Sequence, residues 1–176
     1  RKLAFFALAC ILGLAISFVI YLPSIEYSDF SIRGASSSGG AKYNYATSWS
    51  FHPKEILTFL LPSAFGFGGQ AYWGYMPFTD YPNYMGIILL LLALIAILQK
   101  KNFIKWYLII TSLLALSISF GKYFSFVYDI FYSLAPFFNK FRVPSMILIL
   151  LQFNVSVLAS FGLDNIIKSQ QDKIPS

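Results

Sequence analysis

Long apolar runs with few charged positions divide this chain into blocks. The runs cover residues 3–22, 84–98, 103–120 and 144–163. Because a helix needs about 20 apolar residues to cross a bilayer, each run approaches the length of a membrane span. The pattern predicts an all-α membrane protein, a polytopic helical bundle with about four transmembrane helices. We expect the 176 residues to be a fragment of a longer multi-pass chain, whose remainder packs against them.

Two further apolar segments are too short to span a bilayer. Residues 54–61 lie between Pro53 and Pro62, and residues 122–135 end before Pro136. A helix of about 10 residues covers only about 15 Å, which is half of the hydrocarbon core. The two segments therefore predict short interfacial or re-entrant helices at the membrane surface.

Small residues recur along the first apolar run, and Pro23 closes it. Ala9, Gly13 and Ser17 fall at i, i+4 and i+8, a spacing that places them on one helix face. Such a stripe lets another helix approach closely, and chance spacing in a run rich in Gly and Ala is the alternative. We expect this helix to end near Pro23.

Polar residues also share a face of the last apolar run. Gln152, Ser156 and Ser160 are four residues apart, whereas Asn154 points elsewhere. Polar groups within a span usually face protein or water. This face is therefore expected either to join helices or to line a cavity.

The composition supports the membrane assignment. Hydrophobic residues make up 57% of the chain and charged residues 11%. An ordinary soluble domain is about 25% charged, so this chain cannot cover its surface with polar groups. The net charge of +6 would suit nucleic acid, but the basic residues flank the apolar runs, as membrane orientation requires. We therefore expect membrane lipids, and no nucleic acid, as partners.

The distribution of basic residues predicts the orientation. One side of the membrane carries its basic residues in short segments: Arg1, Lys2, Lys100, Lys101, Lys105, Lys168 and Lys173. The other side carries its basic residues over two much longer connections, residues 23–83 and 121–143: Arg33, Lys42, Lys54, Lys122, Lys140 and Arg142. Because basic residues concentrate in short cytoplasmic segments, we expect cytoplasmic N and C termini and two exterior loops.

Residues 49–86, in the first exterior loop, hold three candidates for chemistry. Glu55 is a candidate base or ligand of a sugar hydroxyl, with a helix N-terminal charge as the alternative. His52 is a candidate proton shuttle near neutral pH, or a hydrogen-bonded loop histidine. Asp80 is a candidate ligand of a substrate hydroxyl or a metal, or a turn residue before Pro82.

Arg142 is the main binding candidate. It stands in the sequence Phe-Arg-Val-Pro, directly before the last apolar run. A guanidinium at a membrane boundary pairs in bidentate fashion with a phosphate, such as a lipid carrier's headgroup. An interfacial anchor and a structural ion pair are the alternatives. Because both exterior loops share one face, we expect Arg142 to meet the first loop.

Aromatic residues fill the same loop. The candidates for stacking on a sugar ring are Trp49, Tyr72, Trp73 and Tyr84. An aromatic belt at the membrane interface is the alternative. The residues supply no Gly-rich phosphate loop, no nucleophile elbow, no cofactor motif and no metal-ligand cluster, and Cys10 is the only cysteine.

Four short motifs follow one another along the chain: Trp49-Ser50-x-x-Pro53-x-Glu55, Leu61-Pro62-x-x-Phe65-Gly66, a Tyr-x-Gly pair at Tyr72 and Tyr84, and Pro136 with Phe141-Arg142-x-Pro144. Their order resembles that of the YfhO-like bacterial membrane proteins, which are similar to GT-C glycosyltransferases. The resemblance covers roughly residues 46–164. It implies a multi-pass protein of the bacterial inner membrane that transfers a sugar from a polyprenyl-phosphate carrier to a cell-envelope glycan or lipid on the exterior face.

The resemblance also implies where the chemistry is incomplete. In GT-C enzymes the catalytic carboxylate lies in an early exterior loop, so we expect it upstream of this chain, and metal dependence stays open. Met146 stands where many relatives are expected to carry a second basic residue, which leaves Arg142 as a single-point phosphate ligand. A transporter or flippase for lipid-linked sugars and a non-catalytic envelope protein are the alternative functions.

Overall fold

The structure, a computed structural model, describes residues 2–28, 30, 41–80, 82–99, 102–136 and 138–171. Helices dominate these residues, and the bridge between Ala64 and Gly66 is the one strand-like pairing that the described chain shows. The all-helical fold class is therefore confirmed for this part of the protein.

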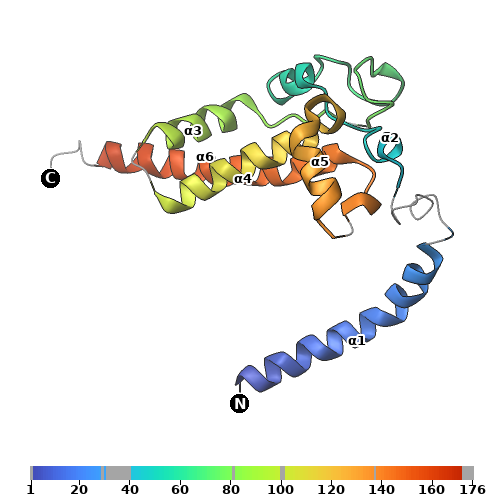
Figure 1. The fold of residues 1–176 in the computed structure, drawn as a ribbon. Coiled ribbons are helices and arrows are strands. Elements are labelled where there is room, and N and C mark those ends of the chain that lie inside the picture. Colours follow the sequence, from blue (N-terminus) through green and yellow to red (C-terminus); the bar gives the residue numbers. More distant parts are fainter. Residues whose placement is uncertain are drawn as a thin grey trace.

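Helix α1 (Lys2–Ser28) lies apart from the other helices (Figure 1). Its apolar side chains stay exposed, with Phe5 at 71% and Val19 at 75%. The prediction of a helix end near Pro23 is wrong, because Pro23 lies inside α1. A proline removes one backbone donor, but a long apolar helix tolerates that loss. The first connection accordingly starts after α1 and not at residue 23.

A bundle of three helices forms the body of the fold (Figure 1). These are α3 (Ile87–Leu98), α4 (Phe103–Ser119) and α6 (Leu148–Gln171), and α6 packs against both of the others. Leu108 of α4 and Leu158 of α6 are buried in the shared core. The predicted bounds of the third apolar run match α4 closely. Helix α6 continues past residue 163, where the fourth apolar run ends, to Gln171.

Small residues allow α3 and α6 to approach closely. A Cβ placed on Gly162 would collide with the backbone of Leu92, and the facing Ala93 is buried. The stripe predicted around Gly13 makes no such contact, since a Cβ there would meet nothing within 4 Å of the described chain. Close helix packing therefore occurs at Gly162.

Among the described polar residues of the last apolar run, Asn154 forms a side-chain hydrogen bond that joins α6 to α4. The amide Nδ2 of Asn154 donates to Oγ1 of Thr111 at 2.9 Å. Ser156 and Ser160 are exposed and donate to carbonyls of their own helix. Serine hydroxyls bond readily to the preceding helical turn, whereas the longer Asn side chain reaches the neighbouring helix. Within the described residues, Asn154 and neither Ser156 nor Ser160 joins α6 to α4 by a side-chain hydrogen bond.

Lys105 caps the far end of α3. Its Nζ donates to the carbonyl of Ala96 at 3.3 Å and lies 5.8 Å from the Phe161 ring centroid. Cations are favourable at helix C-termini, where backbone carbonyls lack partners. Lys105 is buried and therefore holds the bundle together at this end.

A sharp bend separates α4 from α5 (Ser125–Leu134). The two helices meet at 110° through the 3₁₀ helix η3 (Gly121–Phe124). Gly121 has a φ of +46°, and a Cβ there would collide with Ser50. The prediction of a separate short helix that ends before Pro136 is confirmed, with a start at Ser125.

The connections carry only short helices within the described residues: α2 (Tyr43–Ala46), η1 (Pro53–Phe59), η2 (Gly69–Ala71), η4 (Phe138–Lys140) and η5 (Pro144–Ile147). The predicted short helix after Pro53 is confirmed as η1, with Pro53 in its first turn. The first connection and α5 lie at the same end of the bundle, and the C terminus lies at the other end (Figure 1). Described residues of the two connections are therefore neighbours at this end of the bundle.

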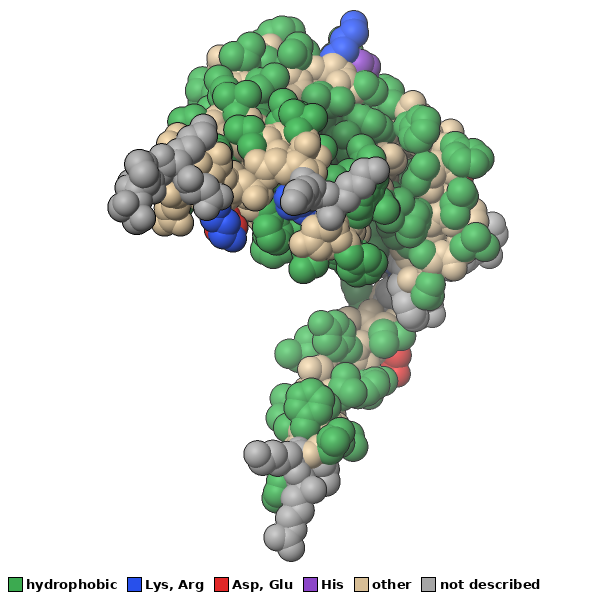
Figure 2. Space-filling view, turned by 90° about the vertical axis from the view of Figure 1, so that its left-hand side faces the viewer, with side chains coloured by type: hydrophobic (Ala, Val, Ile, Leu, Met, Phe, Trp, Pro, Cys, Tyr) green, Lys and Arg blue, Asp and Glu red, His purple; other side chains and the backbone are tan. Residues whose placement is uncertain are grey.

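Two described helices are long and apolar enough to cross a membrane. They are Phe5–Tyr27 and Pro144–Gln171, and the bent pair of α4 with η3 and α5 would add a third. Helix α3 has 12 residues, because Gly86 with a φ of +93° and irregular chain precede it. Apolar side chains dominate the face that Figure 2 shows, both on the bundle and along α1. The membrane character is supported, whereas the count of four spans stays a prediction.

The orientation also stays a prediction. Arg33, Lys100 and Lys101 lie outside the described residues. The structure therefore does not test the predicted membrane orientation at these positions.

Candidate functional site

The site is built where the two connections meet. The backbone N–H of Ala41 donates to the carbonyl of Asn139 at 2.9 Å, and the Tyr132 hydroxyl donates to the carbonyl of Ala41 at 2.6 Å. These bonds fasten the start of the first connection to η4 and α5. As a result, α2 lies beside the segment that carries Arg142.

The guanidinium of Arg142 lies between two aromatic rings. Its Cζ is 4.3 Å from the ring centroid of Tyr45 and 4.0 Å from that of Trp49. Its Nη1 donates to the Tyr45 hydroxyl at 3.2 Å. Aromatic faces attract a guanidinium without neutralising it, so the rings position the cation and leave its charge available.

Arg142 keeps unused hydrogen-bonding capacity. None of the described carboxylates forms a salt bridge with it, and its Nε is buried with no hydrogen-bond partner. A guanidinium has five N–H donors, and a buried donor without a partner costs about 1–3 kcal/mol. The alternative of a structural ion pair is therefore absent within the described residues, whereas the alternative of an interfacial anchor stays open.

Trp49 is held rigidly in this arrangement. Its indole Nε1 donates to the carbonyl of Phe78 at 3.1 Å, and its own carbonyl accepts from the N–H of Ser145 at 3.4 Å. The ring of Phe78 packs edge-on against Trp49 at 5.3 Å. Trp49 thus links the first connection to the start of α6 and fixes one wall of the Arg142 site.

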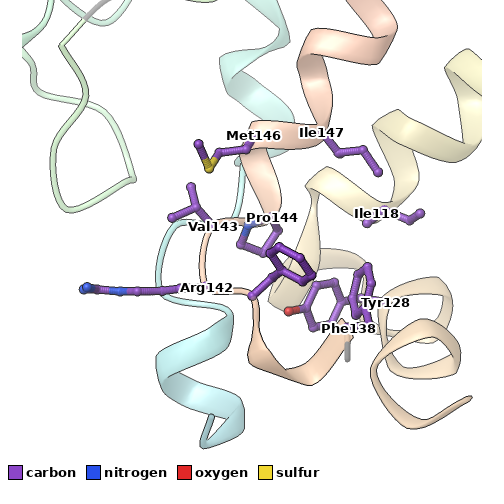
Figure 3. A pocket seen from close by; sticks show the side chains of 9 residues that line it. Ile118, Tyr128, Phe138, Arg142, Val143, Pro144, Met146 and Ile147 are labelled. Atoms are coloured by element: carbon purple, nitrogen blue, oxygen red, sulfur yellow. The ribbon is translucent and has the colours of Figure 1, made fainter. Parts of the chain in front are cut away.

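Two cavities flank Arg142. One, here called the helix cavity, measures about 480 Å³ and is lined by Ile118, Tyr128, Phe138, Phe141 and Ile147 together with Arg142. The other, the loop cavity, measures about 590 Å³ and is lined by Trp49, Phe78, Thr79, Asp80 and Asn83 together with Arg142. Figure 3 shows the Arg142 side chain pointing away from Tyr128 and Phe138 of the helix cavity. The guanidinium therefore lies at the rim of this cavity.

Glu55 is buried and satisfied by the loop. It is 1% exposed, and its Oε1 accepts from the Tyr72 hydroxyl at 2.8 Å and from the N–H of Tyr75 at 2.7 Å. The Tyr72 hydroxyl in turn accepts from the N–H of Met76 at 2.9 Å. Burial raises the pKa of the Tyr72 phenol, and the bond to Glu55 raises it further. Glu55 and Tyr72 therefore organise the turn at residues 72–76.

The space beside Glu55 is too small for a substrate. The cavity that Glu55 lines, with Tyr72 and Thr58, measures about 10 Å³. Such a volume is at the lower limit for a single water molecule. In this conformation the carboxylate supports the loop and does not face an acceptor.

His52 forms the N-terminal cap of η1. Its Nδ1 accepts from the N–H of Lys54 at 3.1 Å, its ring stacks on Tyr75 at 3.7 Å, and Tyr123 packs edge-on at 4.6 Å. These contacts are those of a hydrogen-bonded loop histidine. His52 does not line either cavity at Arg142.

The remaining candidates are divided between the site and the surface. Asp80 is exposed and lines the loop cavity with Arg142, whereas Tyr84 is 45% and Trp73 is 67% exposed, away from the described cavity linings. Trp73 packs against Phe65 at 5.0 Å. The structure thus brings Asp80, Trp49 and Arg142 together and leaves Glu55, Tyr72 and His52 in a supporting layer.

Tyr45 is a site residue that the sequence predictions missed. It lies in α2, which ends at Ala46, whereas Trp49 follows in the turn after this helix. No helical spacing therefore relates the two rings in the sequence. Its neighbour Tyr43 packs on α5, where burial, followed by the adjacent Asp129, raises its pKa to about 12.

The arrangement at Arg142 presents a cation that two aromatic rings hold in place. Among the described residues, no group of three or more His, Cys, Asp and Glu side chains lies close enough to hold a metal ion.

Comparison of the chain with protein-family models, curated proteins and solved structures finds no match. The functional assignment therefore depends on the geometry and on the motifs themselves.

Proposed function

We propose that this chain is the carrier-binding part of a membrane glycosyltransferase of the GT-C-like kind. In this proposal Arg142 binds the phosphate of a polyprenyl-phosphate-linked sugar at the exterior face of a bacterial inner membrane. The chain crosses the membrane about four times, with cytoplasmic termini, as the apolar runs and basic residues predict.

The unpaired guanidinium of Arg142 carries this proposal. It is fixed by Tyr45 and Trp49, it lacks a described carboxylate partner, and it stands at the rim of two cavities. A phosphate ester offers the acceptor oxygens and the charge that such a site needs. The Phe141-Arg142-x-Pro144 motif, which resembles the YfhO-like pattern, supports the same assignment.

The proposed reaction is an inverting displacement. An acceptor hydroxyl attacks the anomeric carbon, the bond from that carbon to the phosphate oxygen breaks, and a carboxylate takes the hydroxyl proton. Arg142 stabilises the charge that develops on the leaving phosphate. Asp80 is a candidate base, because it lines the same cavity as Arg142, and a carboxylate elsewhere in the protein is the second candidate.

A transfer assay tests the proposal. The protein that contains this chain would be reconstituted in liposomes with a labelled polyprenyl-phosphate sugar, and transfer and translocation would both be followed. We expect sugar transfer by the wild type and a loss of about 100-fold or more in Arg142→Ala, as for other single charge-stabilising groups. Lys122→Ala, an exposed lysine at the same end of the fold, is the control.

Each result of the assay has a defined meaning. Unchanged transfer in Arg142→Ala removes Arg142 from the site. Translocation without transfer replaces the enzyme by a transporter. If the wild type shows neither transfer nor translocation, the proposal is contradicted and the non-catalytic alternative is favoured.

A further inference from the structure

The 3₁₀ helix η1 turns polar side chains inward and apolar side chains outward. A 3₁₀ helix has three residues per turn, so Glu55 and Thr58 share one face, and Lys54, Leu57 and the capping residue Leu60 share another. Glu55 and Thr58 are buried, whereas Leu57 is 52% exposed and Leu60 is 43% exposed. A helix on a water-facing surface has the opposite order, with its apolar face toward the core.

Hydrogen bonds explain the burial of the polar face. Oγ1 of Thr58 donates to the carbonyl of Glu55 at 2.6 Å, and Oε1 of Glu55 accepts from the Tyr72 hydroxyl and from the N–H of Tyr75. Buried polar groups are stable in a fold when they have such partners. The loop therefore fixes Glu55 inward, and the row of η1 that starts at Lys54 faces outward.

The outward residues of η1 form an apolar patch beside α3. The members of this patch are all exposed: Ile56, Leu57, Leu60 and Leu61. The N–H of Met85, just before α3, donates to the carbonyl of Phe59 at 3.2 Å, which joins η1 to the start of that helix. Ile88 of α3 is exposed as well. Contiguous exposed apolar surface is typical of contact with a membrane or a protein and not of contact with water.

The unequal lengths of α3 and α4 determine the depth of η1. The two helices are level at one end, where Lys105 near the start of α4 contacts Ala96 near the end of α3. Helix α3 has 12 residues and α4 has 17, so α4 extends about 7–8 Å further at 1.5 Å per residue. The N–H of Phe51 donates to the carbonyl of Ser119, the last residue of α4, at 2.8 Å. Because Phe59 is bonded beside the start of α3, η1 occupies the step between the two helix ends (Figure 1).

We propose that η1 is a re-entrant segment at membrane depth, with its apolar patch against the acyl chains of the leaflet at this end of the bundle. It supplies the lipid-facing surface that α3, with 12 residues, is too short to provide. Lys54 lies one turn from Leu57 on the outward row, about 6 Å along the axis, and places its ammonium among the headgroup phosphates. A lysine at the edge of an apolar patch matches the layers of a lipid leaflet, which is anionic above and apolar below. The inference does not depend on the role of Arg142.

Spin labels on the outward row measure this depth. The protein that contains this chain, with Cys10→Ala, is reconstituted in liposomes that contain phosphatidylglycerol, and a nitroxide is attached to Lys54→Cys, Leu57→Cys or Ile88→Cys. Collisions are measured with oxygen, which partitions into hydrocarbon, and with a nickel chelate, which stays in water. We expect the ratio of oxygen to chelate collisions at Leu57 to be severalfold higher than at Lys54 and close to that at Ile88, the reference on α3.

A matched pair of carboxylates gives an independent measurement. Leu57→Asp and Lys54→Asp place the same group one turn apart on the outward row. Both positions are exposed within the described structure, so neither substitution disturbs the packed core. Because a charge in hydrocarbon is costly, Leu57→Asp should lower the melting temperature in liposomes by several degrees, whereas Lys54→Asp should leave it unchanged.

Two results would overturn the inference. If the label at Leu57 meets the chelate as often as the label at Lys54, and the two aspartate variants melt together, η1 faces water. If the label at Leu57 is shielded from both oxygen and the chelate, a protein segment and not lipid covers the patch. Either result leaves the transfer assay of Arg142→Ala unaffected, so failure of this inference is distinguishable from failure of the proposed function.

Discussion

Glu55 and Arg142 are two charged side chains at the same end of the fold with opposite surroundings. Glu55 is buried, and its Oε1 accepts hydrogen bonds from the Tyr72 hydroxyl and from the N–H of Tyr75, so this oxygen is occupied by the loop. Arg142 is half-buried, and its Nη1 donates a hydrogen bond to the Tyr45 hydroxyl, while its buried Nε has no hydrogen-bond partner. A carboxylate that accepts hydrogen bonds from the loop stabilises the fold, whereas a guanidinium without a described carboxylate partner keeps its positive charge uncompensated.

The role of Glu55 predicts a loss of stability upon truncation. Glu55→Ala leaves the Tyr72 hydroxyl and the Tyr75 N–H without their acceptor, which should lower the free energy of unfolding by roughly 1–3 kcal/mol. Thermal unfolding in detergent measures this change. Glu26→Ala, at an exposed site in α1, should leave the melting temperature unchanged. A melting temperature of Glu55→Ala equal to that of the wild type would contradict the supporting role.

At the scale of elements, the apolar pattern predicts the positions of helices better than it predicts which helix faces pack together. The run at residues 103–120 became α4 because polar residues mark both of its ends. Two residues show the limits of prediction from the apolar pattern. Pro23 lies inside a helix that it was expected to end. Gly162 makes a close helix contact that its position in the sequence did not indicate. Which face of an apolar helix is buried depends on neighbours that are distant in the sequence, so a stripe of small residues alone does not identify it.

The contact between α3 and α6 predicts a sensitivity that is specific to one glycine. Gly162→Ala places a methyl group against the backbone of Leu92, so the helices must separate, and the cost should be about 1–3 kcal/mol. Gly13→Ala, in a helix where the added carbon meets no described atom, should be neutral or slightly stabilising. Unfolding in the presence of denaturant compares the two variants. Equal stability of Gly162→Ala and the wild type would show that the helices do not pack as described.

At the scale of the whole molecule, the site combines segments that no local pattern connects. The sequence indicated Arg142 from its position before a span and Trp49 from the aromatic loop. It did not indicate Tyr45 or Phe78, because their contacts come from the hydrogen bonds of Ala41 to η4 and of Trp49 to Phe78. Such bonds join residues far apart in the chain and leave no periodic signal.

The arrangement of the ends predicts a testable topology. With Cys10 replaced by Ala, single cysteines at Lys54 and Lys122 should both react with a membrane-impermeant maleimide from outside intact cells. A cysteine at Lys168, near the opposite end of α6, should react only after permeabilisation. Labelling of positions 54 and 122 from different sides would contradict the shared exterior face.

Binding of a lipid phosphate to Arg142 is the central claim, and equilibrium titration with undecaprenyl phosphate tests it most directly. We expect Arg142→Ala to weaken binding about 10- to 100-fold, because charge-assisted hydrogen bonds are lost. The affinity of Arg142→Lys should lie between those of the wild type and Arg142→Ala, since an ammonium keeps the charge but not the bidentate geometry. The affinity of Lys122→Ala should match that of the wild type. Equal affinities of the wild type and Arg142→Ala would contradict the account.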